Sequence, residues 1–212
     1  MHSILKQKTW VLFLALIILN LGTFISLSTL ESDNLFYNEF ANQFSSEQIN
    51  VIISNKDKYG WVAYIFLPLI LTLKLVLISC SFFVGIFFLN IKASFTKIIK
   101  AVIVADFLFI IPTLIKLIWF SFFNTEYSLK DVQYFYPLSV LNLVDYNLID
   151  KVWIYPFQLI NVFEFLYIFL IAYILKMQFK IDFDKSLSAV LLSYVPVLFM
   201  LMVISVFLSL LY

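Results

Sequence analysis

The stretch WVAYIFLPLILTLKLVLISCSFFVGIFFLN, residues 61–90, decides the fold of this chain. It is longer than the ~20 residues with which a helix crosses the hydrocarbon layer of a bilayer. Four further apolar stretches reach or exceed that length, at about residues 10–30, 98–123, 152–175 and 187–212. Because backbone groups in lipid must be hydrogen-bonded within the protein, the sequence predicts an all-α, polytopic membrane helical bundle with five transmembrane helices.

The composition leaves little material for a soluble domain. The chain is 63% hydrophobic and 13% charged, and the segments between spans, about residues 31–60 and 124–151, are too short for a second core. We therefore predict a single membrane domain over residues 1–212. The net charge of +1 and the dispersed basic residues give no sign of nucleic-acid binding.

The placement of lysines predicts the orientation. Lys6 and Lys8 precede the first apolar stretch, as in a cleavable leader, but that stretch exceeds the usual 7–15 residues and lacks an Ala-x-Ala site, so we expect a retained span. Lysines favour the cytoplasmic side in short loops. The side with more of them carries Lys6, Lys8, Lys92, Lys97, Lys100, Lys176, Lys180 and Lys185. The opposite side carries Lys56, Lys58, Lys130 and Lys151. We expect a cytoplasmic N-terminus and an extracytoplasmic C-terminus.

The first outer loop contains a helical pattern at about residues 34–53. Phe36, Phe40 and Phe44 recur every four residues and share one helical face. The pattern predicts an amphipathic helix on the outer membrane surface. It would cover the ends of the spans or, alternatively, form a docking face for a partner or lipid.

Four ionisable residues fall inside the predicted spans: Lys74, Asp106, Lys116 and Glu164. Each costs ~2.5 to 3.5 kcal/mol on insertion scales unless it finds a partner, water or the interface. Their charges balance, so mutual pairing inside the bundle is expected. For Asp106 we favour a loop lysine near Lys100, with gating or proton handling as the alternative.

Glu164 falls near the middle of the predicted fourth span, where a glutamate cannot reach the interface. Gln158 and Asn161 precede it at three-residue steps and would form one polar stripe. The stripe predicts hydrogen bonds between helices or a path for a proton, ion or substrate. We expect Lys74, or else Lys116, to pair with Glu164, unless either lysine extends to the interface.

Several catalytic patterns are missing from the sequence. It has no G-x-x-x-x-G-K-[ST] loop, H-E-x-x-H or G-x-S-x-G motif, and its single His and single Cys, His2 and Cys80, are far apart in the chain. Acid–base work by Asp106 and Glu164 is conceivable, but nothing positions a substrate. We expect no enzyme activity, no metal and no cofactor.

The fourth span, INVFEFLYIFLIAYIL at residues 160–175, is similar to the Asn-x-Phe-Glu stretch of the Yip family. It is followed by the short loop KMQFKIDFDKS, residues 176–186, and by a last span that contains Tyr194. The likeness covers about residues 68–212. The chain lacks the Asp-Leu-Tyr-Gly-Pro-type motif and the long N-terminal region of the eukaryotic members. The resemblance implies a bacterial-type, Yip-like membrane protein without a settled activity. We expect it in the bacterial inner (cytoplasmic) membrane.

Two functions follow as hypotheses. The first is a non-enzymatic scaffold or accessory subunit of a larger membrane assembly, with the lipid bilayer and other membrane proteins as partners. The alternative is a permease or transporter subunit in which Glu164, with Lys74 or Lys116, lines a pathway.

Overall fold

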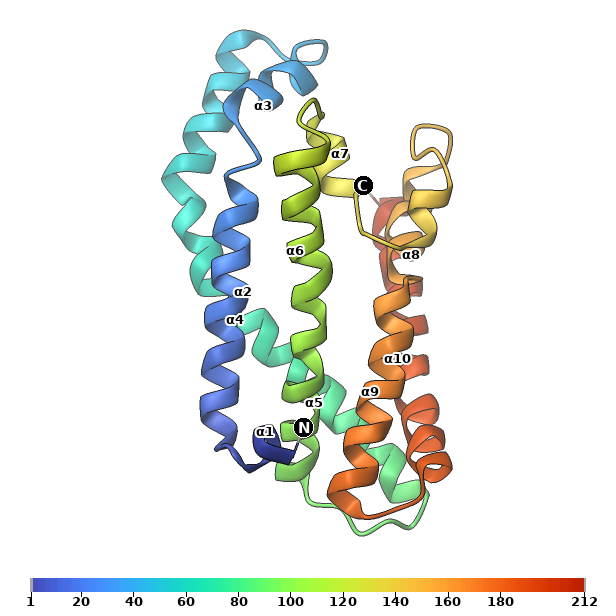
Figure 1. The fold of residues 1–212 in the computed structure, drawn as a ribbon. Coiled ribbons are helices and arrows are strands. Elements are labelled where there is room, and N and C mark those ends of the chain that lie inside the picture. Colours follow the sequence, from blue (N-terminus) through green and yellow to red (C-terminus); the bar gives the residue numbers. More distant parts are fainter. Residues whose placement is uncertain (1, 212) are drawn as a thin grey trace.

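The computed structural model describes residues 2–211 and confirms an all-helical chain in that part (Figure 1). Five segments are long and apolar enough to cross a membrane: α2 (Thr9–Ser28), α4 (Ser46–Phe88), the third span (Phe95–Phe123), α9 (Val162–Phe179) and α10 (Phe183–Leu211). The third span consists of α5 (Phe95–Asp106), η1 (Phe107–Phe109), α6 (Ile110–Ile118) and the π-helical turn η2 (Trp119–Phe123). The remaining helices are α1 (His2–Lys6), α3 (Asp33–Phe40), α7 (Leu129–Tyr134), η3 (Val140–Leu143), η4 (Lys151–Trp153) and α8 (Ile154–Leu159).

The two ends of the bundle differ. At one end, here called the tight end, lie α1 and the short connections at residues 89–94 and 180–182, drawn at the bottom of Figure 1. At the other, the loop end, lie the longer segments at residues 29–45 and 124–161. The eight lysines that predict the cytoplasmic side are in segments of the tight end, where Lys100 Nζ bonds the carbonyl oxygens of Leu5 and Gln7 at 2.6 and 2.5 Å.

The main core is concentrated toward the tight end, where α4, α5, α9 and α10 meet. Its fully buried side chains include Phe82, Ile98, Ile171 and Leu175. Of these helices, α4 and α10 approach closely because Gly85 of α4, which has no side chain, faces α10. A Cβ atom on Gly85 would lie 1.8 Å from Ser193 Oγ.

Toward the loop end the helices separate. Figure 1 shows α4 and α10 diverging upward from their contact near the tight end. A second, smaller cluster of Leu30, Phe120 and Val132 joins α7 to the loop-end tips of the first and third spans. Beyond Tyr194, α10 has no buried residue as far as Leu211.

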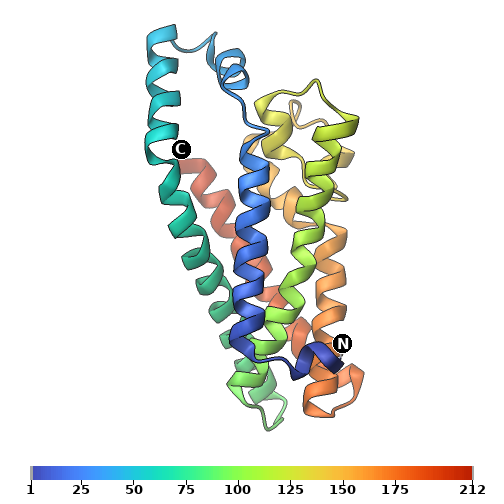
Figure 2. The ribbon, with the colours of Figure 1, turned by 60° about the vertical axis from the view of Figure 1, so that its left-hand side comes forward.

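The predicted outer-loop helix at residues 34–53 is wrong in its boundaries. The Phe stripe does form, with ring centroids 6.3 Å apart for Phe36–Phe40 and 5.9 Å for Phe40–Phe44. However, the helix is interrupted at residues 41–45. A capping box formed by Ser45 and Gln48 then begins α4. From there α4 continues into the span predicted at residues 61–90 as one helix of 43 residues, which Figure 2 shows rising beside α3.

The prediction of one fourth span over residues 152–175 is also wrong in its boundaries, because this stretch contains two helices, α8 and the first part of α9. Between α8 and α9 the backbone at Asn161 is extended, with φ −144° and ψ 161°. Here the backbone forms hydrogen bonds with residues 138–140 in place of bonds within a helix. Val140 N–H donates to the Ile160 carbonyl oxygen at 2.9 Å, and Val162 N–H donates to the Leu138 carbonyl oxygen at 3.2 Å. This bridge replaces helical hydrogen bonds, so α9 begins at Val162 and extends to Phe179.

Candidate functional site

The two interior carboxylates lie beside departures from regular α-helix. Asp106 is the last residue of α5, directly before the 3₁₀ turn η1. Glu164 lies in the first turn of α9, just after the break at Asn161. Irregular turns of this kind are frequent at functional sites in helices. The two carboxylates are therefore the centre of the candidate site.

Asp106 forms an ion pair with Lys74 of α4. Lys74 Nζ lies 2.6 Å from Asp106 Oδ1, and the Asp106 side chain is 2% exposed. The Lys74 side chain is 39% exposed, and its ammonium stands 4.6 Å from the centroid of the Phe109 ring. The ring and the carboxylate thus share one cation, which ties α4 to the third span.

Glu164 is held by two neighbours of different kinds. Its backbone N–H donates to Asn161 Oδ1 at 2.9 Å, which caps α9. Its carboxylate accepts a hydrogen bond of 2.7 Å from the Tyr194 hydroxyl of α10. A negative side chain in the first turn is also favoured by the helix dipole.

These pairings correct three predictions. Lys74 pairs with Asp106 and not with Glu164. Asp106 does not pair with a loop lysine, since Lys100 instead bonds backbone carbonyls of the N-terminal segment. Glu164 is not central in its span, because the break at Asn161 places it at the start of α9. The sequence identified the charged residues but not their partners, which depend on the relative rotation and depth of the helices.

The predicted polar stripe of Gln158, Asn161 and Glu164 does not lie on one helix. Gln158 belongs to α8, and its side-chain amide donates to the carbonyl of Tyr134 at 2.8 Å. The Asn161 amide donates back to the carbonyls of Gln158 and Leu159 at 2.9 and 3.1 Å. Two of the three residues therefore stabilise the break itself.

Lys116 lies apart from the other three charges. It is on α6, and the charged group that acts on it is Glu31, just beyond the end of α2. Among the described residues, the ion pairs are Lys74–Asp106 and Lys130–Glu39, so the structure does not bring Lys116 and Glu164 together.

Tyrosines complete the site, and the charge-based search of the sequence missed them. The ring centroids of Tyr167 and Tyr194 are 4.9 Å apart, and Tyr167 also contacts Phe109 at 5.1 Å. The Tyr167 hydroxyl is buried with no hydrogen-bond partner among the described residues. The spacing of Tyr167, three residues after Glu164 on one helix, was the signal that could have found it.

A third tyrosine approaches the site from the loop end. Burial, together with the charges of Glu164 and Asp106, raises the pKa of Tyr136. Its hydroxyl is therefore a neutral hydrogen-bonding group over the whole physiological range. Two carboxylates, one ammonium and three phenols can bind one further positive charge or exchange a proton. Among residues 2–211 no group of three His, Cys, Asp or Glu could hold a metal ion.

No family model, curated protein or solved structure matches this chain. The Yip family resemblance therefore stays a prediction.

Proposed function

We propose that this protein is a non-enzymatic integral membrane protein that serves as a scaffold or accessory subunit of a larger membrane assembly. Its tight end, with eight of the fourteen lysines, faces the cytoplasm, and the membrane is the bacterial inner membrane. The observation that carries the proposal is the uneven packing of its helices.

The loop-end half of α10 supports this role. Residues 195–211 contain no buried side chain, and Phe199 and Leu210 are 67% and 71% exposed. The first span is similar, since Leu12 and Leu16 are its only buried residues within α2. Helices in lipid associate through close packing of side chains, and these two offer long apolar surfaces for neighbouring helices.

The interior contacts support a structural role as well. The Lys74–Asp106 pair joins α4 to α5, and the Tyr194–Glu164 bond joins α10 to α9. Gln158 in turn fixes α8 to the end of α7. Each polar group named here links two segments that are distant in the chain, as expected of a rigid support.

Proximity cross-linking tests the proposal. A photo-reactive side chain at Phe199 or Leu210 should capture defined membrane proteins in cells, whereas one at Leu166, exposed on α9, serves as the matched control. Capture of the same protein from both α10 positions and not from the control supports the role. Cross-links to lipid alone at all three positions contradict it.

The permease alternative is favoured by a specific observation: both interior carboxylates lie beside departures from α-helical geometry, Asp106 before the 3₁₀ turn η1 and Glu164 after the extended backbone at Asn161. Broken helices with acidic residues are a common way to build a transport site. For this function, Glu164→Gln should abolish proton-coupled or ion flux in proteoliposomes while leaving thermal stability unchanged. If the protein is a scaffold, the wild type should show no flux in the same assay, and Glu164→Gln should weaken the contact between α9 and α10.

A further inference from the structure

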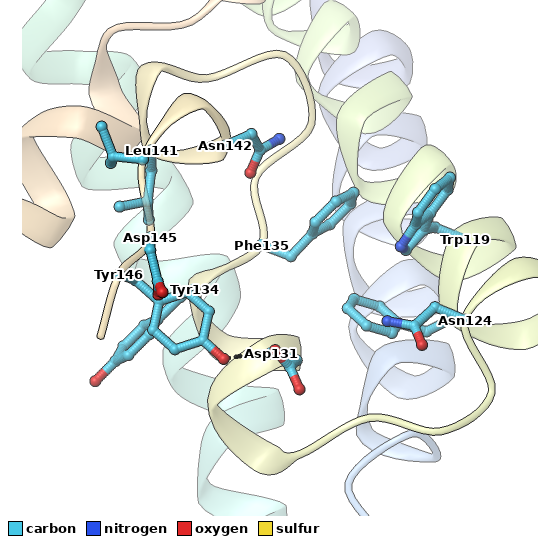
Figure 3. Close-up of a pocket in the computed structure, with 11 residues that line it drawn as sticks. Trp119, Asn124, Asp131, Tyr134, Phe135, Leu141, Asn142, Asp145 and Tyr146 are labelled. Atoms are coloured by element: carbon cyan, nitrogen blue, oxygen red, sulfur yellow. Dashed lines mark hydrogen bonds between the residues drawn. The ribbon is translucent and has the colours of Figure 1, made fainter. Parts of the chain in front are cut away.

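A separate hollow lies at the loop end, and none of the four interior charges lines it. It has a volume of 380 Å³, within the range of small-molecule sites. Its walls come from the end of the third span, from α7 and from the segment that contains η3. Figure 3 shows Trp119 and Asn124 on one side and Tyr134, Tyr146 and Asp131 on the other. We call it the loop-end pocket.

Aromatic rings dominate the pocket. The five that line it are Trp119, Phe120, Tyr134, Phe135 and Tyr146. They hold one another in place: Phe120 and Phe135 meet edge to face at 5.3 Å, and so do Tyr134 and Tyr146. Rings fixed in this way line the hollow with rigid aromatic surface at little entropic cost.

The pocket is also acidic. Asp131 and Asp145 line it, and no lysine does so among the residues described around it. The neighbouring Lys130 is directed elsewhere, because its ammonium lies 2.6 Å from Glu39 Oε1 of α3. The charge of this lining is therefore negative at neutral pH.

The two carboxylates have different roles. Asp131 Oδ1 accepts from the Tyr146 hydroxyl at 2.6 Å, and Oδ2 accepts from the backbone and hydroxyl of Ser128 at 2.8 and 2.7 Å. Burial alone would raise the pKa of Asp131, but these bonds outweigh it and lower the pKa, so the charge persists. Asp145 is exposed and uses Oδ1 for Asn147, and its Oδ2 has no partner among the described residues.

We propose that the loop-end pocket binds a small organic ammonium cation, held by the aromatic rings and by the carboxylate of Asp145. Aromatic faces attract quaternary and alkylated ammonium groups, whose charge is spread over apolar methyl groups. Hard inorganic cations instead require six or more oxygen ligands, which rings cannot supply. This site goes beyond the proposed scaffold role and does not depend on it.

Binding of choline to the purified full-length chain in detergent tests the proposal. Its neutral isostere 3,3-dimethylbutan-1-ol, at equal ionic strength, is the control ligand. Calorimetry should show saturable choline binding, with the isostere weaker by about tenfold or more. Equal affinities for the two ligands, or no choline binding, would overturn the proposal.

Variants locate the site. Asp145→Asn keeps the acceptor for Asn147 and should weaken choline binding by about fivefold to tenfold. Tyr134→Leu replaces an aromatic ring by an aliphatic side chain and should weaken choline binding similarly. Asp150→Asn, an exposed acid of the same segment outside the pocket, should leave the affinity unchanged. Choline affinity that is unchanged in both pocket variants, with thermal stability retained, would also overturn the assignment.

Discussion

The tight end and the loop end of this bundle are held together by different forces. At the tight end, four helices bury a continuous apolar core and touch closely at Gly85. At the loop end, the contacts are aromatic pairs, hydrogen bonds and the partly exposed Lys130–Glu39 pair around a small cluster. The difference predicts that folding stability resides mainly in the tight-end half, while the loop end holds the site at which we propose recognition. The following predictions test that division, from the largest expected effect to the smallest.

Asp106→Ala should be the most damaging change. It removes the buried carboxylate that pairs with the partly exposed Lys74 side chain, and losing one partner of a buried pair costs up to ~3 kcal/mol. The free energy of unfolding, from SDS titration in mixed micelles, measures the loss. The control is the double variant Lys74→Met with Asp106→Leu, which removes both charges and should restore most of the stability. A double variant as unstable as Asp106→Ala would contradict a pairwise role.

Gly85→Leu should cost about 2 kcal/mol, as expected for overpacking at a close contact. The first added carbon already lies 1.8 Å from Ser193 Oγ and 3.2 Å from the Ala189 carbonyl oxygen, so α4 and α10 must separate. Gly60→Leu is the matched control in the same helix, because nothing lies within 4 Å of its added Cβ. Equal losses in the two variants, measured as thermal midpoints, would show that α4 and α10 do not depend on this contact.

Tyr194→Phe should cost about 1 kcal/mol, the usual net value of one hydrogen bond. The change removes the donor to Glu164 and keeps the ring that contacts Tyr167. Tyr173→Phe, exposed on α9, is the control and should be neutral. Hydrogen exchange of the first turns of α9 should increase in Tyr194→Phe alone. Unchanged exchange there would argue that the hydroxyl does not hold this break.

The loop end should show the smallest effect, and the pH dependence of that effect should be confined to extremes of pH. Burial raises the pKa of Asp131, but the hydrogen bonds from Tyr146 and Ser128 together outweigh it and lower the pKa below 3.8. The contribution of Asp131 is therefore complete above about pH 4 and is lost as pH falls through the lowered value. Burial and the bond to Asp131 raise the pKa of Tyr146 from 10.0 to about 12, so its contribution is complete below about pH 10 and is lost as pH rises through about 12.

Hydrogen exchange of residues 124–161 checks this pH dependence. Protection should be flat from about pH 5 to 9, and Tyr146→Phe should reduce it by a similar factor across that window. A bell-shaped profile centred near neutral pH would instead require another titrating group in this segment.

Helix ends and partners were harder to predict than spans. The interruption of the helix at residues 41–45 was hard to predict from the local sequence. The capping box of Ser45 and Gln48 adjoins phenylalanines that recur every four residues, as they would in one continuous helix. The break before α9 had no local marker that outweighed the apolar run, since the bonds that replace its helix come from residues 138–140. Glu164 was therefore assigned to the middle of a span.

The sequence by itself determined that five segments are long and apolar enough to span a membrane, and which four charges lie among them. It could do so because transfer from water to hydrocarbon is close to a sum over residues along one segment. Only the tertiary structure decided that Lys74 meets Asp106, that Tyr194 meets Glu164, and that aromatic rings from separate segments surround one acidic pocket. These contacts depend on the rotation and depth of whole helices. Rotation and depth are fixed by the packing of helices against one another and cannot be read from any single segment.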